Sequence, residues 1–85
     1  MYLSVIGVKP LDNYVLELMF ENKEVRLFAM KEYLDFGIFT RLRDVDFFNK
    51  VHVSFDSIEW PYGIDLDPEI LYEKSVAAYQ VNASR

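Results

Sequence analysis

The chain has 85 residues, of which 52% are hydrophobic and 27% charged, which is typical of one small globular domain and not of a disordered segment. It contains no cysteine, which excludes disulfides and thiolate metal sites and is in keeping with the cytoplasmic location that we expect. It contains no apolar run of the roughly 18–20 residues that a membrane-spanning helix needs, and its acidic second half disfavours an anionic membrane as a partner. Its 9 basic and 14 acidic residues give a net charge of −5, which disfavours direct binding to nucleic acid.

The first 28 residues predict an antiparallel meander of three strands. The apolar segment Tyr2–Lys9 is closed by Pro10, and Tyr14–Phe20 alternates strictly, with its even-numbered side chains facing inward. A tight connection then leads into Glu24–Phe28, which alternates again. Because this connection contains no glycine, Asn22 is expected to take the positive φ that a tight turn requires.

Between residues 29 and 49 the period-two pattern stops, and short helical or irregular segments are expected. These segments are Ala29–Leu34, Gly37–Leu42 and Asp46–Asn49. We expect them to pack over one face of the sheet with five apolar side chains, which are Leu34, Phe36, Phe39, Leu42 and Phe47.

A second pair of strands is predicted after residue 50. Val51–Phe55 alternates with its odd-numbered side chains inward, and the chain turns at residues 56–57 into the short strand Ile58–Trp60. Trp60 is expected in the core because it alternates with an outward-facing glutamate.

The next segment is predicted to end the sheet and to start the last helix. Pro61 cannot donate a ladder hydrogen bond, so the strand should end before it. Asp67 is expected to be the N-cap and Pro68 the first helical residue, because a proline there loses no helical hydrogen bond. The helix should continue to near residue 79, with three residues on one face, Tyr72, Val76 and Tyr79.

Together these elements predict an α+β fold with an antiparallel sheet of about five strands, short helices between the third and fourth strands, and a C-terminal helix. Residues 1–80 are expected to form a single domain and residues 81–85 a frayed tail. The residues expected to fix the junction between the sheet and the last helix are Trp60, Pro61, Gly63, Asp67 and Pro68.

Several short patterns are shared with one protein family. The most specific is Ile58-x-Trp60-Pro61-x-Gly63-x-Asp65-Leu66-x-Pro68-x-x-Leu71-Tyr72, accompanied by Phe20-x-x-x-Glu24, Gly37-x-Phe39-x-x-Leu42 and Phe48-x-x-Val51-x-Val53. Over about residues 2–73 the chain resembles the Domain of Unknown Function 2442 family of small bacterial domains. The resemblance implies an α+β fold and a regulatory role, because some relatives carry a helix-turn-helix domain or are encoded beside toxin-like partners. It implies no catalytic residue.

The chain departs from the family pattern at two turns. Lys23 stands where the family commonly has glycine, and Tyr62 stands where it often has asparagine. Both departures bear on the type of turn rather than on the fold.

The alternating residues Asp65, Asp67 and Glu69 resemble a site for a hard cation. A calcium loop of the EF-hand type needs a glycine at its sixth position and a glutamate at its twelfth, and Pro68 interrupts the run here. We therefore expect a capped helix, in which Glu69 complements the positive end of the helix dipole. No metal and no other cofactor is expected.

His52 is the single histidine, and with Ser54 and Glu59 it superficially resembles a hydrolase site. Side chains two apart on a strand are about 7 Å from each other, which is beyond hydrogen-bond reach. No nucleophile elbow or glycine-rich oxyanion loop accompanies them. We therefore expect no catalytic residue.

The second half of the chain favours a protein partner with a basic surface. Residues 44–85 carry three basic and eight acidic residues, so Lys and Arg side chains are their natural complement. Tyr62 is the expected apolar contact, with Glu59 and Glu69 beside it. We expect a non-catalytic interaction or regulatory module. Two alternatives remain open, an accessory subunit of a nucleic-acid-associated complex and an enzyme with an unrecognised site.

Overall fold

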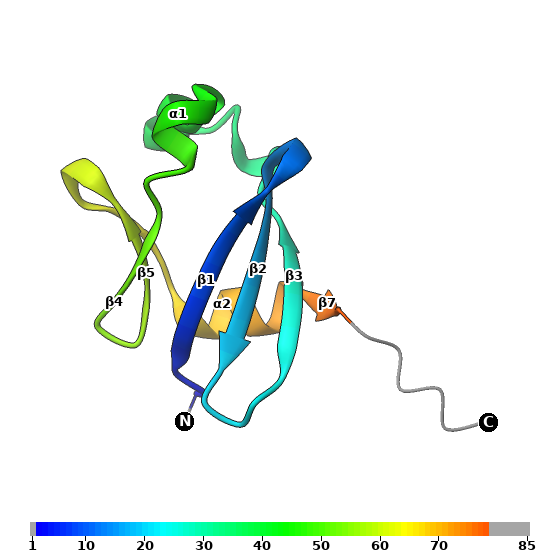
Figure 1. The fold of residues 1–85 in the computed structure, drawn as a ribbon. Helices are drawn as coiled ribbons and strands as arrows, with labels where there is room; N and C mark the ends of the chain where they lie inside the picture. Colours follow the sequence, from blue (N-terminus) through cyan, green and yellow to red (C-terminus); the bar gives the residue numbers. More distant parts are fainter. Residues whose placement is uncertain (1, 79–85) are drawn as a thin grey trace.

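The beginning and the end of the described chain form one four-stranded antiparallel sheet. The computed structural model describes residues 2–78, and Figure 1 shows this sheet in front of helix α2 (Pro68–Lys74). The meander predicted for the first 28 residues is confirmed, and the even-numbered side chains of its central strand are buried. The strands lie in the order β1 (Val5–Leu11), β2 (Val15–Phe20), β3 (Val25–Ala29) and β7 (Val76–Ala77).

Pro10 lies inside β1, opposite Leu16, rather than closing the strand as predicted. The reason is that β1 is an edge strand, where the proline nitrogen can face away from the ladder at no cost in hydrogen bonds. The 3-10 turn η1 (Asp12–Tyr14) then leads to β2, with positive φ angles of 63° at Asn13 and 60° at Tyr14.

The turn between β2 and β3 does not use Asn22 as predicted. Lys23 takes the positive φ, at 75°. The side-chain oxygen of Asn22 accepts a hydrogen bond from the backbone N–H of Glu24 at 3.0 Å, and its Nδ2 donates to the Glu24 carboxylate at 2.8 Å. These bonds hold Asn22 at the start of the turn and leave the left-handed position to Lys23.

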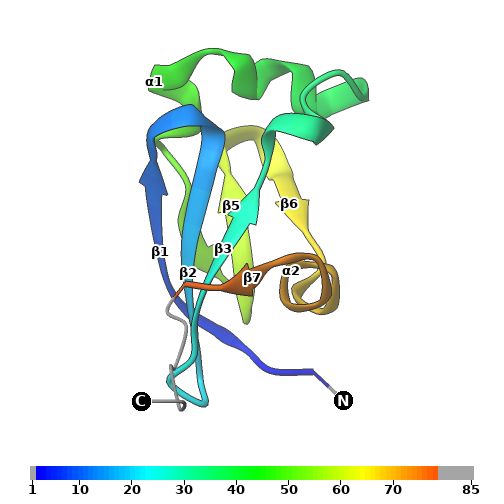
Figure 2. The ribbon, with the colours of Figure 1, turned by 90° about the vertical axis from the view of Figure 1, so that its right-hand side faces the viewer.

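A second antiparallel sheet of three strands lies beside the first and shares its core (Figure 2). It consists of β4 (His52–Ser54), β5 (Ser57–Trp60) and β6 (Ile64–Leu66), with β5 in the centre. The strands predicted near β4 and β5 are present, whereas β6 and β7 were not predicted. The strands of residues 2–78 therefore form two sheets instead of the single predicted one.

The hairpin between β4 and β5 turns one residue earlier than predicted. Ser54 pairs with Ser57, which leaves Phe55 and Asp56 as a two-residue loop with φ angles of 48° and 70°, as in a type I′ turn. The inward position predicted for Phe55 is therefore wrong. Phe55 lies at the tip of the hairpin and is 97% exposed.

The three short helical segments expected between residues 29 and 49 are present. They are η2 (Lys31–Tyr33), η3 (Gly37–Arg43) and α1 (Val45–Phe48), and they lie across the ends of the strands rather than over a sheet face (Figures 1 and 2). Leu34 and Leu42 are buried as expected, but Phe36 is 65% exposed. The prediction for Phe36 is wrong because it precedes η3 in extended conformation, outside any helical face.

Helix α2 begins at the predicted N-cap. The Oδ1 of Asp67 accepts a hydrogen bond from the backbone N–H of Glu69 at 2.8 Å, and Pro68 occupies the first turn. Such a cap satisfies one of the backbone donors that the first turn of a helix leaves free. Leu71 is buried, so the face of the helix that carries it packs against the core.

The predicted end of this helix near Tyr79 is wrong, since the helix ends at Lys74 and Val76 belongs to β7. Ser75 is extended because Arg26 of β3 holds it, with Nε donating to its hydroxyl at 2.8 Å and an Nη donating to its carbonyl at 2.7 Å. Tyr79 itself, and the tail predicted for residues 81–85, lie outside the described residues.

Trp60 is completely buried, as predicted, and its Nε1 donates a hydrogen bond to the Phe48 carbonyl at 2.8 Å. The predicted α+β fold is confirmed. Within residues 2–78, no helix is both long and apolar enough to cross a membrane. The buried apolar side chains come from both sheets, α2 and the short helical segments: Val5, Leu16, Leu18, Phe20, Phe28, Met30, Leu34, Leu42, Phe48, Ile58, Trp60, Ile64 and Leu71.

Candidate functional site

The outer side of the three-stranded sheet carries a row of ionisable side chains. Ile58 and Trp60 of β5 face the core, so the alternation of the strand turns Glu59 outward. Glu59 is opposite His52 of β4 on one side and Asp65 of β6 on the other. Three strands thus bring one imidazole and two carboxylates together on one face.

A second row lies one step closer to the hairpin tip. Ser54 is paired with Ser57, and the Ser57 hydroxyl donates a hydrogen bond to the Leu66 carbonyl, which ties β5 to β6. Asp67 follows directly after β6. The two rows border a groove of about 510 Å³, hereafter the acidic groove, lined by Ser54, Phe55, Ser57, Ile58, Glu59, Asp65, Leu66, Asp67 and Pro68.

Within residues 2–78, no Lys or Arg forms a salt bridge with a carboxylate of the acidic groove. The salt bridges between arginine and carboxylate in this part of the chain join Arg26 to Glu24 and Arg43 to Asp35. Glu59 and Asp65 are directly opposite each other, and like charges in that position repel. The Nε2 of His52 lies 3.9 Å from a carboxylate oxygen of Glu59. The groove therefore keeps a negative potential.

Phe55 lines one end of this groove and contributes almost nothing to the core. Its left-handed conformation costs an L-residue about 1–2 kcal/mol, and its ring is exposed. Sequence reasoning missed Phe55 because type I′ turns are usually marked by Asn-Gly or Asp-Gly, and Phe55-Asp56 carries no such signal. The result is an aromatic ring held next to a negatively charged groove.

The structure does not bring Tyr62, Glu59 and Glu69 to one surface. Tyr62 is 78% exposed in the turn after β5, where its ring stacks on Phe47 with centroids 6.1 Å apart and lies 5.1 Å from the Arg41 guanidinium. Glu69 lines a separate hollow of about 240 Å³ together with Tyr2, Leu3, Tyr72 and Glu73. Of the three predicted residues, Glu59 lines the acidic groove.

The hydrolase-like trio lies on one face but is not joined into a relay. The Nδ1 of His52 is 3.2 Å from the backbone carbonyl of Lys50, so this nitrogen already has a hydrogen-bond partner. Within the described part of the chain, Ser54 makes no hydrogen bond to His52, and no group of three or more His, Asp or Glu side chains is arranged to hold a metal ion.

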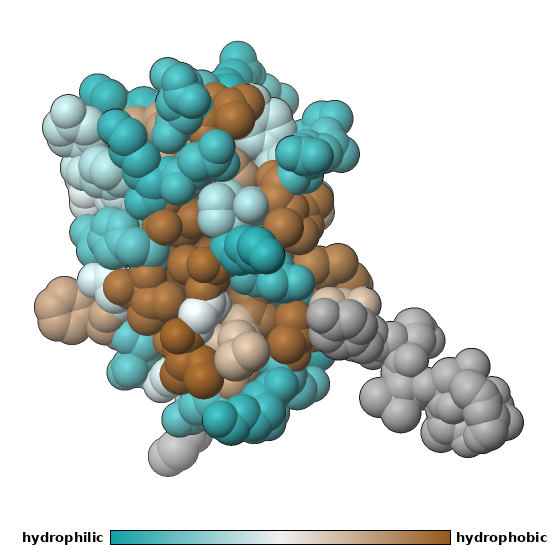
Figure 3. Space-filling model, viewed as in Figure 1, coloured by the Kyte–Doolittle hydropathy of each residue, from teal (hydrophilic) through white to brown (hydrophobic). Residues whose placement is uncertain are grey.

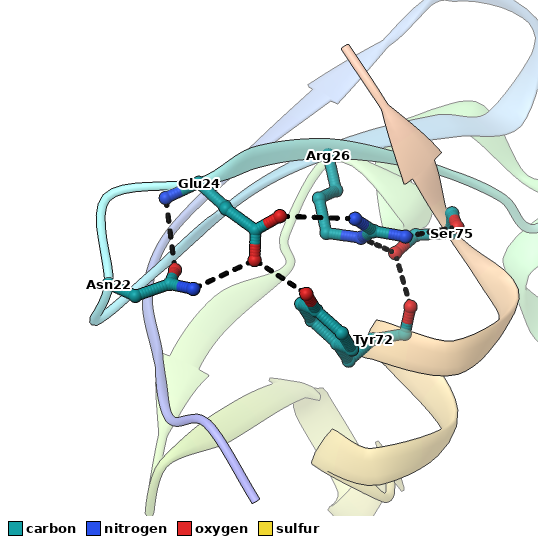
Figure 4. A network of polar contacts seen from close by, with 5 residues as sticks. All are labelled: Asn22, Glu24, Arg26, Tyr72 and Ser75. Atoms are coloured by element: carbon teal, nitrogen blue, oxygen red, sulfur yellow. Dashed lines mark hydrogen bonds and ion pairs between the residues drawn. The ribbon is translucent and has the colours of Figure 1, made fainter.

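A polar network that sequence reasoning missed joins the first hairpin to α2 (Figure 4). The Tyr72 hydroxyl donates to Glu24 Oε1 at 2.6 Å, and Arg26 lies 3.4 Å from the other oxygen of Glu24. The Arg26 guanidinium also covers the Tyr72 ring, 4.3 Å from its centroid. The hydrogen bonds from Tyr72 and Asn22 lower the pKa of Glu24, and the bond to Glu24 raises the pKa of Tyr72.

This network has a structural role. It connects residues almost fifty positions apart, and no buried side-chain nitrogen or oxygen of residues 2–78 lacks a partner. Since its groups are already paired with one another, the network offers no free group to a ligand. It fixes α2 and β7 against β3, which sets the position of the acidic groove at the start of α2.

The comparisons with known proteins point to one family. A family model described as "Protein of unknown function (DUF2442)" matches residues 5–77, from the start of β1 to the end of β7. No curated protein and no solved structure matches the chain. The match thus covers both sheets, the acidic groove and the polar network.

Proposed function

This chain belongs to the DUF2442 family, whose function is unknown, and we propose from its own surface that it is a non-catalytic interaction module that binds a basic segment of another protein. The observation that supports this proposal is the acidic groove with the exposed ring of Phe55 at its end. We place this binding in the cytoplasm, in keeping with the cysteine-free sequence.

The charges of the acidic groove define the chemistry of the partner. Glu59, Asp65 and Asp67 present carboxylates that complement the ammonium groups of lysines or the guanidinium groups of arginines. Such pairs at a solvent-exposed rim mainly raise the rate of association and weaken with salt. They select a basic partner without supplying most of the affinity.

The affinity requires an apolar anchor, and Phe55 is the residue that fits this role. Aromatic side chains dominate the energetics of interfaces, and the tight turn fixes the backbone that carries the exposed ring of Phe55. A groove of about 510 Å³ has the size of an ordinary ligand site and accommodates side chains of a short protein segment. Phe55 and the carboxylates would contact the same segment.

The test is affinity capture from the cells that make this protein, with variants in the bait. Phe55→Ser is expected to lose the partner at every salt concentration, whereas the double change Glu59→Lys, Asp65→Lys is expected to weaken capture mainly at low salt. The matched controls are Phe36→Ser, an exposed phenylalanine elsewhere, and Glu32→Lys with Asp46→Lys, two exposed acids outside the groove. Both controls should retain the partner.

The same experiment separates the proposal from its rivals. A partner lost with Tyr62→Ala but retained with Phe55→Ser would move the contact to the Tyr62 turn and refute the groove. The proposal includes no direct contact with nucleic acid or membrane, because of the net charge of −5. A gel shift of the isolated protein at low salt should show no complex. A complex would favour the alternative of a nucleic-acid-associated subunit.

A further inference from the structure

The outer face of the four-stranded sheet is unusually apolar. Antiparallel sheets with one face on the core normally carry polar side chains on the other face. Here the strand alternation turns one lysine and one glutamate outward on β1–β3, Lys9 and Glu17. The other outward-facing residues are Gly7, Leu11, Val15, Met19, Val25, Leu27, Ala29 and, on β7, Val76.

This face is open in the described part of the chain. None of these outward residues is buried, and none of them packs against the core cluster of residues 2–78. Figure 3 looks onto this side of the molecule and shows apolar surface over the region of β1, β2 and β3. Apolar patches of this kind on soluble domains usually mark an interaction site.

The pairing of β1 with β2 arranges the face in three rows. Leu11 is opposite Val15 in the first row, and Lys9 is opposite Glu17 in the second. Gly7 is opposite Met19 in the third row, where a hollow of about 160 Å³ is lined by Gly7, Val8, Lys9, Glu17, Met19 and Val25. Each row thus pairs two different residues: a larger with a smaller side chain in the first and third rows, and a cation with an anion in the second.

We propose that this face binds a second copy of the chain, with a two-fold axis parallel to the strands and between β1 and β2. Such an axis places β1 of one copy over β2 of the other and leaves each row at the same height. In every row, the β1 residue of one copy therefore faces the β2 residue of the other. Lys9 then faces Glu17 of the second copy, and each copy supplies one such pair. An axis perpendicular to the strands would instead place Lys9 over Lys9.

The apolar rows fit the same axis. Leu11 packs on Val15 of the second copy, and the flexible Met19 side chain fills the hollow that Gly7 leaves on the opposite sheet. A face with one cation and one anion at the same height complements itself, whereas a strongly charged partner would leave one of the two groups unpaired. This charge complementarity is the reason for choosing a second copy.

The size of the contact predicts a weak dimer. Strands lie about 4.8 Å apart and rise about 3.3 Å per residue, so two strands of six residues cover only a few hundred Å² of each copy. This is below the roughly 800 Å² per partner of a standard interface, so we expect a dissociation constant of about 10–100 μM.

The test is sedimentation of the full chain between about 1 μM and about 1 mM, a range that spans the expected dissociation constant. The wild-type protein should change from monomer to dimer within this range. A protein that remains monomeric at the upper limit overturns the proposal and assigns the face to another protein or to residues 79–85.

Charge reversals identify the axis. Lys9→Glu and Glu17→Lys should each weaken self-association about tenfold or more, which corresponds to about 1.4 kcal/mol, because like charges then meet across the axis. A mixture of the two variants should form a heterodimer in which every charge is paired again. The matched controls Lys31→Glu and Glu32→Lys, exposed in η2, should leave the constant unchanged.

A mixture that associates no better than either variant alone would contradict the two-fold arrangement. Pairing within one chain cannot restore association in the mixture, because each variant carries two like charges at positions 9 and 17 and only a partner can supply the opposite charges. The surface is separate from the acidic groove, so the proposed partner binding stands or falls independently.

Discussion

Lys23 and Tyr62 occupy the left-handed backbone region, with φ angles of 75° and 71°. They stand at the two turn positions where the resemblance noted in the sequence implies glycine and asparagine, the residues that enter this region most easily. The departures seen in the sequence therefore leave the turns in place and add strain to them. For Tyr62, stacking on Phe47 and the nearby Arg41 offset part of that strain.

Replacing Lys23 by glycine is expected to stabilise the protein. The left-handed conformation costs a residue with a Cβ about 1–2 kcal/mol, and the added freedom of glycine in the unfolded chain takes back about 0.5–1 kcal/mol. Urea unfolding should show Lys23→Gly about 0.5–1 kcal/mol more stable than wild type. The control Lys23→Ala retains the Cβ, and an equal gain there would show that strain is not the cause.

Phe55 is expected to trade stability for binding. Asparagine suits the first position of a type I′ turn, and the exposed ring contributes little to the core, so Phe55→Asn should stabilise the fold by about 0.5–1 kcal/mol. The same variant should lose the captured partner. Thermal unfolding and affinity capture check the two effects. A destabilised variant would mean that the ring packs on its own chain.

At the scale of elements, the polar network predicts how stability depends on pH. Hydrogen bonds from Tyr72 and Asn22 lower the pKa of Glu24 in the folded state. The contribution of Glu24 to the free energy of unfolding is therefore complete above the unfolded-state pKa of about 4.3. It is lost as the pH falls through the lower pKa that Glu24 has in the folded protein. For Tyr72 the pKa is raised in the folded protein. Its contribution to the free energy of unfolding is therefore complete below the unfolded-state pKa of about 10 and is lost as the pH rises through the folded-state pKa.

Urea unfolding of Glu24→Gln against wild type checks this prediction. The wild type should be the more stable protein near neutral pH, and the difference should shrink below about pH 4.3. The control Glu32→Gln, in an exposed position, should show a constant difference. If the difference in the free energy of unfolding between wild type and Glu24→Gln does not change with pH, the charge of Glu24 does not stabilise the fold and the prediction is wrong.

Some elements could be predicted from sequence because their pattern is local. The strict alternation of β2 and the Asp-Pro start of α2 are visible within a few residues. Strands β6 and β7 have three and two residues, too few to show a period. Val76 also matched helical spacing with Tyr72, and the bonds from Arg26 that end the helix join residues far apart in the sequence.

At the scale of the whole molecule, the two sheets share one core and leave two outer faces of different character. One face carries the acidic groove and the other the apolar rows of β1 and β2. The count of charges along the sequence predicted that the second half of the chain carries an acidic surface. It could not tell which carboxylates share a face, because that depends on the registers that place Glu59 beside Asp65 and separate both from Glu69.

The acidic groove also shows why the predicted contact residues were only partly brought together. Exposure of Tyr62 followed from its turn, but the tip of the other hairpin was assigned to a strand, so Phe55 was assigned to the core. The turn begins one residue earlier than predicted, which removes Phe55 from the strand while His52 and Glu59 keep the outward positions expected for them. That single shift decided which aromatic residue lies next to the carboxylates.

The most direct test of the proposed function is hydrogen–deuterium exchange of this protein, free and in complex with its captured partner. Backbone amides of Ser54–Glu59 and Asp65–Asp67 should exchange more slowly in the complex, while those of the Tyr62 turn and of Asn22–Arg26 should not change. Protection confined to the Tyr62 turn or to the outer face of the four-stranded sheet, with the groove unaffected, would contradict the account.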